Sequence, residues 1–229
     1  MQPTFLPWLG YFELLESVDT FVFLDNVQFE ARSWQQRNRI IIDNKVRWLT
    51  IPVSLPFGRL TRIDQALINV EHFSGSKICK TLTQAYINKK GFDFISNNIF
   101  KILLDPPRNI SDFNITLINE IANALKIKTP LKIASEMNVY GNKGDLLLDI
   151  CKNQSATTYV APSGSAVYLD GYSGFSDSAI NLEYQSFEHP SYSQGEMKFV
   201  SHLSVVDVIC NTGVKATEEM IKKRVELNE

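Results

Sequence analysis

Residues 1–48 read MQPTFLPWLGYFELLESVDTFVFLDNVQFEARSWQQRNRIIIDNKVRW, and this stretch holds the pattern that decides the fold. At its centre is an uninterrupted apolar run, residues 20–24, which stops at Asp25 and Asn26. A short apolar run between polar residues is typical of a strand buried on both faces, as in a parallel sheet. Because the carboxyl ends of such strands open onto the ligand crevice, we expect Asp25 and Asn26 at the mouth of a crevice.

A basic and amide-rich segment follows this strand. Arg37 has Asn38 and two glutamines close beside it, and guanidinium groups pair bidentately with phosphate and carboxylate groups. Trp8, Tyr11 and Trp34 lie in the same stretch and offer rings that stack on a base or a sugar. The combination favours a site for a phosphorylated or carboxylated small molecule.

Each of these features also has a purely structural interpretation. Asp25 and Asn26 are residue types that commonly close a strand by forming a turn. Trp8 and Trp34 are of a type that more often packs in the core or at its rim than against a ligand. The sequence leaves both interpretations open for each residue.

The bulk composition bears on several classes of protein. A chain of 229 residues is long enough for one large domain or two small ones. Its formal net charge of −2 gives no sign of an electrostatic nucleic-acid binder. No apolar run approaches the roughly eighteen residues of a membrane span, and no signal peptide is visible. Cys79, Cys151 and Cys210 are too scattered for a disulfide framework or a metal cluster, so we expect a reducing, cytoplasmic setting without a bound metal.

The remaining pattern predicts a single α/β domain over residues 1–229, with a mostly parallel sheet flanked by helices. Residues 41–70 indicate a small antiparallel β-rich insertion on that sheet, and residues 76–128 a mainly helical segment. The first loop begins at Gln2, without the strand that ordinarily feeds such a loop. We expect either that a strand precedes Gln2 in a longer chain or that this chain dispenses with it.

A loop of small residues adds candidates in the C-terminal half. A predicted strand at residues 157–161 runs into Ser163 and Gly164, just before a predicted helix. Such a loop exposes backbone N–H groups that can hold an anion. It lacks the lysine of a P-loop and the flanking glycine of a nucleophile elbow, so neither chemistry is supported.

A second loop carries one of the three histidines. His189 follows a predicted strand at residues 180–187, and Tyr192 and Gln194 lie close behind it. A histidine in a polar loop after a strand suits a general base, while a lone histidine also serves as a packing residue. We expect this loop and the opening fifty residues to line the same cleft.

Five blocks of residues extend the pattern over nearly the whole chain. They are Gln2-Pro3 with Pro7-Trp8-Leu9-Gly10-Tyr11-Phe12; Asp25 with Gln28-Phe29; Trp34 with Arg37-Asn38-Arg39; Trp48-Leu49-Thr50 with Pro52-Val53; and a C-terminal block of Tyr159, Ser163-Gly164, Tyr168-Leu169, His189-Pro190, Tyr192, Gln194, Phe199, Leu203-Ser204, Asp207, Asn211 and Gly213. In these blocks the chain resembles the WbqC-like protein family of bacteria, often associated with surface-polysaccharide (O-antigen) biosynthesis. Where that family tends to show Lys-His in the middle helix, this chain has Lys77-Ile78, so no histidine role carries over there.

A second likeness concerns the fold. The order of proline loop, Gly10-Tyr11, helix, buried strand and Asp25 is similar to the opening of nucleotidyltransferase-type domains such as pantothenate synthetase. It implies a Rossmann-like parallel sheet. Those domains grip nucleotide phosphates with loop histidines, and residues 6–11 of this chain contain none, so adenylyl transfer does not follow from the likeness.

The family likeness implies a transferase that acylates or aminoacylates the amine of a nucleotide-linked amino sugar. His189 or Asp25 would take the proton from the attacking amine. No cofactor is expected to bind tightly, and an acyl thioester of coenzyme A or of an acyl or aminoacyl carrier protein would be the donor. The expected substrate-binding residues are Gln2, Trp8, Gly10, Tyr11, Asn26, Trp34, Arg37, Asn38, Ser163, Gly164, Tyr192 and Gln194.

Two other functions stay open at the level of sequence. An ATP-dependent ligase or nucleotidyltransferase would release AMP or pyrophosphate, but the missing loop histidines and the missing Gly-Lys phosphate loop count against it. A non-catalytic partner of a carrier protein or glycosyltransferase would need no pocket. The concentration of Trp, Arg and Asn in one segment favours a small-molecule site over that function.

Overall fold

The computed structural model describes residues 1–228, in which helices surround short strands that pair two by two. The helices are α1 (Leu9–Glu16), α2 (Gly75–Tyr86), α3 (Phe92–Phe94), α4 (Phe100–Leu104), α5 (Ile110–Ala124), α6 (Gly144–Asn153), α7 (Ala166–Leu169), α8 (Val205–Thr212) and α9 (Val214–Asn228). The strands are β1 (Phe21–Phe23), β2 (Arg37–Ile42), β3 (Lys45–Thr50), β4 (Val53–Ser54), β5 (Leu67–Ile68), β6 (Leu131–Ile133), β7 (Thr158–Ala161) and β8 (Asn181–Tyr184).

Two pairs of strands are parallel, in line with the predicted α/β class and with the apolar run at residues 20–24. β1 lies beside β6, with Phe21 opposite Leu131, and β7 lies beside β8, with Thr158 opposite Asn181. Among the described strands these pairs are separate two-stranded sheets. The structure is therefore a mixed α/β fold with parallel pairs, and it does not confirm the continuous Rossmann-like sheet of a nucleotidyltransferase.

Antiparallel pairing occurs between residues 37 and 68, where β2 pairs with β3 and β4 with β5. These pairs are not joined to the parallel strands as an insertion on the main sheet would be. The β2–β3 hairpin turns at Asp43 and Asn44, whose φ angles are 50° and 55°. Two left-handed residues are the signature of a type I′ turn, whose twist matches that of the flanking strands.

The helical segment follows from its caps and its apolar spacing. The Ser74 hydroxyl caps α2, and the Asn109 side chain accepts hydrogen bonds from two backbone N–H groups at the start of α5. A π-helical turn, Ile95–Ile99, joins α3 to α4. In α5 the apolar residues recur every four positions and are fully buried against the main core. Within residues 1–228, every helix is too short or too polar to traverse a lipid bilayer.

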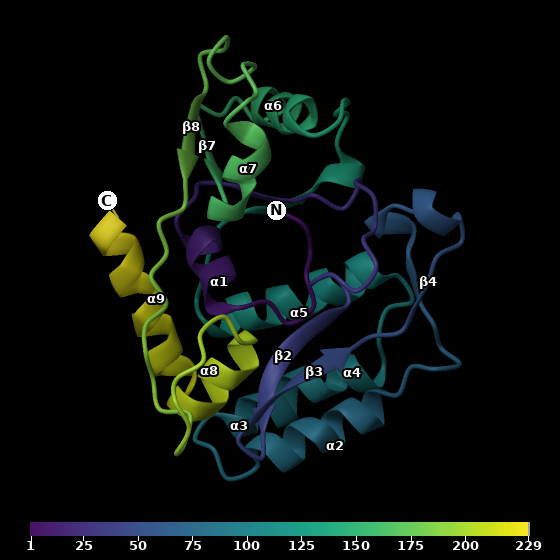
Figure 1. Cartoon of the computed structure of the whole chain (residues 1–229), viewed down its shortest axis with the longest axis vertical. Helices are drawn as coiled ribbons and strands as arrows, with labels where there is room; N and C mark the ends of the chain where they lie inside the picture. Colours follow the sequence, from purple (N-terminus) through teal and green to yellow (C-terminus); the bar gives the residue numbers. More distant parts are fainter. Residues whose placement is uncertain (229) are drawn as a thin grey trace.

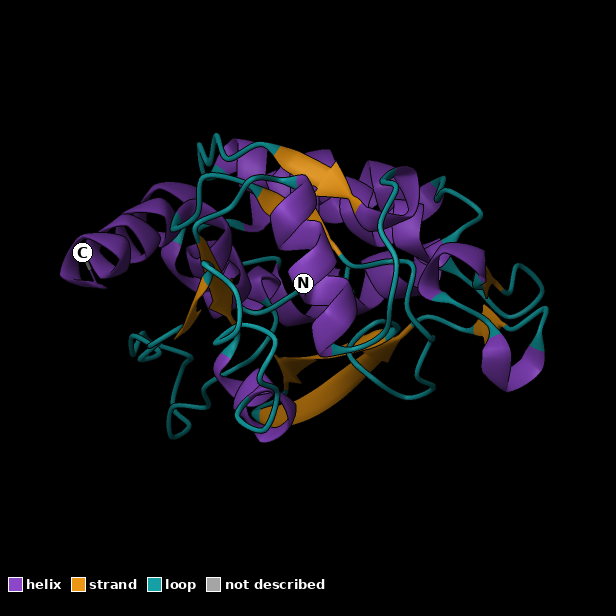
Figure 2. Ribbon diagram, turned by 90° about the horizontal axis from the view of Figure 1, so that it is seen from above, coloured by secondary structure: helices purple, strands orange, loops and turns teal. Residues whose placement is uncertain are grey.

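The arrangement brings distant parts of the chain together. The strand pair β7–β8, with α6 and α7, forms the upper part of the view in Figure 1, and the hairpin β2–β3 lies below, with α8 beside it. Figures 1 and 2 both place the N-terminus in the middle of the molecule. Residues 185–204 run from β8 back to α8, and they carry the His189 loop across to the hairpin side.

Candidate functional site

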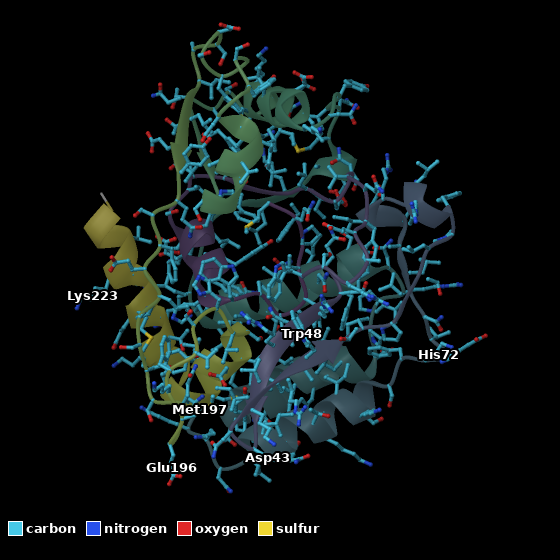
Figure 3. All side chains as sticks on the ribbon, viewed as in Figure 1. Asp43, Trp48, His72, Glu196, Met197 and Lys223 are labelled. Carbon is cyan, nitrogen blue, oxygen red and sulfur yellow. The ribbon has the colours of Figure 1, made fainter. Side chains whose placement is uncertain are left out.

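The outward face of the hairpin carries two guanidinium groups and an indole. Because side chains alternate along a strand, Arg37 and Arg39 share one face of β2 while Asn38 and Ile40 are buried on the other. The register places Arg39 opposite Trp48. Figure 3 shows Trp48 near the centre of the view, with Asp43 farther down the hairpin.

Aromatic rings lie against both guanidinium groups. The Arg37 Cζ lies 4.2 Å from the ring centroid of Trp48. The Arg39 Cζ lies 5.5 Å from the Trp34 ring and 5.9 Å from the Trp48 ring, and the two indoles are 5.4 Å apart. These distances fit cation–π contact, and each indole keeps 46% of its surface exposed. The guanidinium–indole surface is the name used below for these four side chains: Trp34, Arg37, Arg39 and Trp48.

The positive charge of this surface is not neutralised by an ion pair within the described part of the chain. Among the described residues, the ion pairs include no carboxylate partner for Arg37 or Arg39. The Nε atoms of both are buried without a hydrogen-bond partner, while Nη2 of Arg39 donates to the backbone oxygen of His202 at 3.2 Å. Two such guanidinium groups on one face are suited to binding an anion.

An aromatic cluster adjoins the guanidinium–indole surface through His202. The ring of His202 stacks on Trp8 with centroids 4.6 Å apart and lies 5.6 Å from the ring of His189. Phe187 meets Trp8 edge-on at 5.0 Å. Because Arg39 bonds the backbone of His202, the opening segment and the His189 loop lie on the same face of the molecule.

His189 is in the neutral form that a general base requires, but its free ring nitrogen is buried. Its Nδ1 lies 2.9 Å from the Pro190 oxygen, so Nδ1 carries the hydrogen and Nε2 holds the lone pair. Burial lowers the pKa of His189 and so favours the neutral ring. Nε2 is buried without a partner in the described structure, among Trp8, Phe199 and their neighbours. Proton transfer at Nε2 therefore requires the covering side chains to move.

Tyr192 and Gln194 anchor this loop from within. The Tyr192 hydroxyl donates to Asp207 Oδ2 at 2.8 Å, and Tyr86 donates to Oδ1 at 2.7 Å. Gln194 Nε2 donates to the Val200 oxygen at 2.9 Å. Gln194 Nε2 also lies 3.3 Å from Asp207 Oδ2 and donates to it. Burial raises the pKa of Asp207, although these three side-chain donors oppose that shift. Both expected binding residues are thus engaged in holding the loop on α8.

Several expected binding residues form hydrogen bonds or close contacts that hold the segment around residues 2–11 in place. The Gln2 side chain accepts a hydrogen bond from Gln35 at 3.0 Å, and the buried Tyr11 hydroxyl donates to the Gln2 oxygen at 3.1 Å. Asn38 Nδ2 donates to the Leu6 oxygen at 2.7 Å. Gly10 gives room for Trp8, because a Cβ there would lie 2.3 Å from its ring.

Asp25 lies at the carboxyl end of β1, as predicted, but its carboxylate is engaged. Ser135 donates to it twice, from N to Oδ1 at 2.8 Å and from Oγ to Oδ2 at 2.7 Å. The side chain is 2% exposed. Its hydrogen-bond donor Ser135 is not part of the guanidinium–indole surface. Asn26 keeps a buried Oδ1 without a partner in the described structure. The geometry gives Asp25 the role of joining β1 to the end of β6.

The small-residue loop and the remaining histidine lie elsewhere. Ser163 and Gly164 are exposed in a short turn between β7 and α7, and a Cβ at Gly164 would meet open space. Figure 3 shows His72 toward the right-hand edge, away from Trp48. Of the expected site residues, the structure brings together Trp8, Trp34, Arg37 and His189.

Arg39, Trp48 and His202 were not among the expected site residues. A signal for two of them was present, because a type I′ turn at Asp43 and Asn44 fixes the hairpin register and hence the pairing of Arg39 with Trp48. His202 carried no such signal, since its position depends on the irregular segment 185–204.

The sequence matches a known family over nearly its full length. The model of the WbqC-like protein family matches residues 2–219. The chain is also similar to the uncharacterized protein Rv1507c of Mycobacterium tuberculosis (strain ATCC 25618 / H37Rv), with 27% identity over 220 residues that cover 95% of this chain and 94% of the relative. No solved structure matches the chain.

Proposed function

The chain belongs to the WbqC-like protein family, and from that premise we propose that it is a transferase of surface-polysaccharide biosynthesis. Its substrate would be a nucleotide-linked amino sugar, whose amine receives an acyl or aminoacyl group. The observation that supports this proposal is the guanidinium–indole surface, with two guanidinium groups that lack carboxylate partners in the described structure.

The proposed roles follow from the chemistry of each side chain. Arg37 and Arg39 bind the diphosphate, because a guanidinium group donates two parallel hydrogen bonds to phosphate oxygens. Trp34 and Trp48 stack on the base or the sugar through their exposed faces. His189 lies next to His202, whose backbone Arg39 binds, and its proposed role is to take the proton from the amine.

The proposed step joins the sugar amine to a thioester. The amine nitrogen attacks the carbonyl carbon, a C–N bond forms, and the C–S bond breaks. His189 Nε2 takes the proton from the nitrogen and returns it to the departing thiolate, so a thiol leaves. This step needs the segment 185–204 to uncover Nε2, which is buried in the structure. The donor is a thioester of coenzyme A or of a carrier protein.

A mass measurement tests the activity. The protein is mixed with a panel of UDP- and dTDP-linked amino sugars and with acyl thioesters, and the sugar nucleotides are examined by mass spectrometry. We expect a gain equal to the mass of the acyl group with at least one pair. No gain with any pair, together with no binding of any nucleotide sugar, defeats the proposal.

Two variants refine the test. His189→Gln should lower the rate about 10²–10⁴-fold, the usual contribution of a general base. Arg47→Ala serves as a matched control, because Arg47 is an exposed arginine of the same hairpin and belongs to neither the guanidinium–indole surface nor the aromatic cluster. An unchanged rate in His189→Gln would remove His189 from the mechanism while leaving the binding surface in place.

A further inference from the structure

A cavity of about 630 Å³ lies beside strand β8. Its wall comes from the end of α7, from the loop between α7 and β8, and from β8 itself. Figure 1 shows this part of the chain in the upper half of the view and the hairpin β2–β3 in the lower half. None of the lining residues belongs to the guanidinium–indole surface, so the proposed transfer reaction does not use this cavity.

Aromatic rings form part of the wall. Phe175 is 3% exposed, and its ring is held between a stacked Tyr159 at 5.5 Å and an edge-on Tyr172 at 5.9 Å. Tyr184 of β8 also lines the cavity. The face of such a ring is apolar and attracts a cation that lies within about 6 Å of its centroid. An aromatic wall therefore suits an apolar group or a cation.

The charge of the wall favours a cation. Asp170 is the carboxylate that lines the cavity, and the described lining residues include no lysine, arginine or histidine. The surrounding sequence has the same character, because residues 153–197 contain neither lysine nor arginine. The ion pairs of the described chain do not include Asp170. Its charge is therefore available to a positively charged ligand.

The side-chain hydroxyl groups of the wall act mainly as acceptors toward a ligand. Five of them line the cavity, and four donate their hydrogens within the protein: Tyr172 to Asp145, Ser176 to the Ser173 oxygen, Ser178 to the Phe175 oxygen, and Tyr184 to Asp170. The hydrogen bond to Asp170 raises the pKa of Tyr184 to about 12, so this hydroxyl keeps its hydrogen at neutral pH. A hydroxyl oxygen that has donated its hydrogen still accepts through its lone pairs.

We propose that this cavity binds a small molecule that carries a protonated amine. An ammonium group donates hydrogen bonds and accepts none, so it matches a wall that combines acceptor oxygens, the Asp170 carboxylate and aromatic rings. A neutral sugar matches this wall less well, because each of its hydroxyl oxygens also needs a donor. The volume of the cavity lies in the usual range for small-molecule sites.

Titration calorimetry with two matched pairs of ligands tests the proposal. Glucosamine is compared with glucose, and cadaverine with 1,5-pentanediol, at pH 6, where the amines are protonated. Within each pair the molecules have nearly the same shape, and one of them carries ammonium in place of hydroxyl. We expect both amines to bind and their neutral partners to bind at least roughly tenfold more weakly, because a charge-assisted hydrogen bond is about twice as strong as a neutral one.

Two variants with the same change of charge locate the site. Asp170→Asn removes the charge and keeps an oxygen that can accept from Tyr184. Asp177→Asn is the matched control, because Asp177 is exposed in the same loop and does not line the cavity. The first variant should weaken amine binding roughly tenfold, and the second should leave it within about twofold of the unmodified protein.

Three outcomes would overturn the proposal. An equal loss in the two variants would mean that the general charge of the loop, and not the cavity, attracts the amine. Glucose bound as tightly as glucosamine would make the cavity a site for neutral sugars. Binding of neither amine would exclude the proposed class of ligand. None of these outcomes involves the transfer reaction, so the proposed function stands or falls separately.

Discussion

Gly10 shows how one missing side chain positions the aromatic cluster. The Trp8 ring occupies the space that a Cβ of residue 10 would fill, at 2.3 Å. We predict that Gly10→Ala lowers the free energy of unfolding by roughly 1–3 kcal/mol, the usual range for overpacking. Urea denaturation measures this loss. Gly164→Ala is the matched control, because a Cβ there meets no atom within 4 Å; equal losses in both variants would contradict the packing argument.

Asp25 shows how a carboxylate can mark a strand end without facing a ligand. Both of its oxygens accept hydrogen bonds from Ser135. We predict that Ser135→Ala destabilises the protein by about 1–3 kcal/mol, because the buried carboxylate oxygen Oδ2 loses its 2.7 Å hydroxyl donor and keeps only the Ser111 hydroxyl at 3.5 Å. Chemical denaturation at pH 7 measures the effect. A change of less than a few tenths of a kcal/mol would contradict the structural role given to Asp25.

At the scale of elements, Asp207 ties the His189 loop to two helices. It accepts hydrogen bonds from Tyr86 of α2 and Tyr192 of the loop. We predict that Asp207→Ala accelerates hydrogen exchange across residues 186–203 and destabilises the protein by about 3 kcal/mol or more, because two hydroxyl groups and the Gln194 amide lose their acceptor. Tyr86→Phe is the matched control, since it should destabilise the protein while the loop keeps the hydrogen bond from Tyr192 to Asp207. Equal exchange of the loop in both variants would contradict the anchor.

The elements differ in how far the sequence predicts them. The apolar run 20–24 predicts β1, because such a run is buried on both faces of a parallel pair. Residues 35–39 are all polar, so the sequence pattern does not show that Arg37 and Arg39 share one face of a strand. That face can be assigned only once the turn at residues 43 and 44 sets the register of the hairpin. The partner of Asp25 is 110 residues away, so no local pattern could reveal that its carboxylate is occupied.

At the scale of the whole molecule, three basic groups with lowered pKa values should make stability depend on pH. The Met1 amine has its pKa lowered from 8.0 to about 5 by burial, and burial also lowers the pKa values of His189 and His202. Between pH 5 and 8 the unfolded chain binds more protons, so stability rises with pH and is lost as pH falls. The shift of the amine's pKa alone corresponds to an increase of up to about 4 kcal/mol in the free energy of unfolding between pH 5 and pH 8.

Urea denaturation at several values between pH 5 and 8.5 measures this dependence. We expect the free energy of unfolding to increase over that range and to level off above pH 8. Acetylation of the Met1 amine should remove the increase between pH 7 and 8, which the histidines do not produce because their ordinary pKa of 6.5 lies below it. A flat profile in the unmodified chain would contradict burial of the amine.

The guanidinium groups of Arg37 and Arg39 are proposed to bind the diphosphate of a nucleotide-linked sugar, and the proposed function depends on this binding. Isothermal titration with a dTDP- or UDP-linked amino sugar tests it most directly, on the unmodified protein, on the double variant Arg37→Ala/Arg39→Ala and on the control Arg47→Ala. We predict binding by the unmodified protein and the control, and a loss of at least tenfold, about 1.4 kcal/mol, in the double variant. Equal affinity in all three proteins, or no binding by any of them, would contradict the proposal that Arg37 and Arg39 bind the diphosphate.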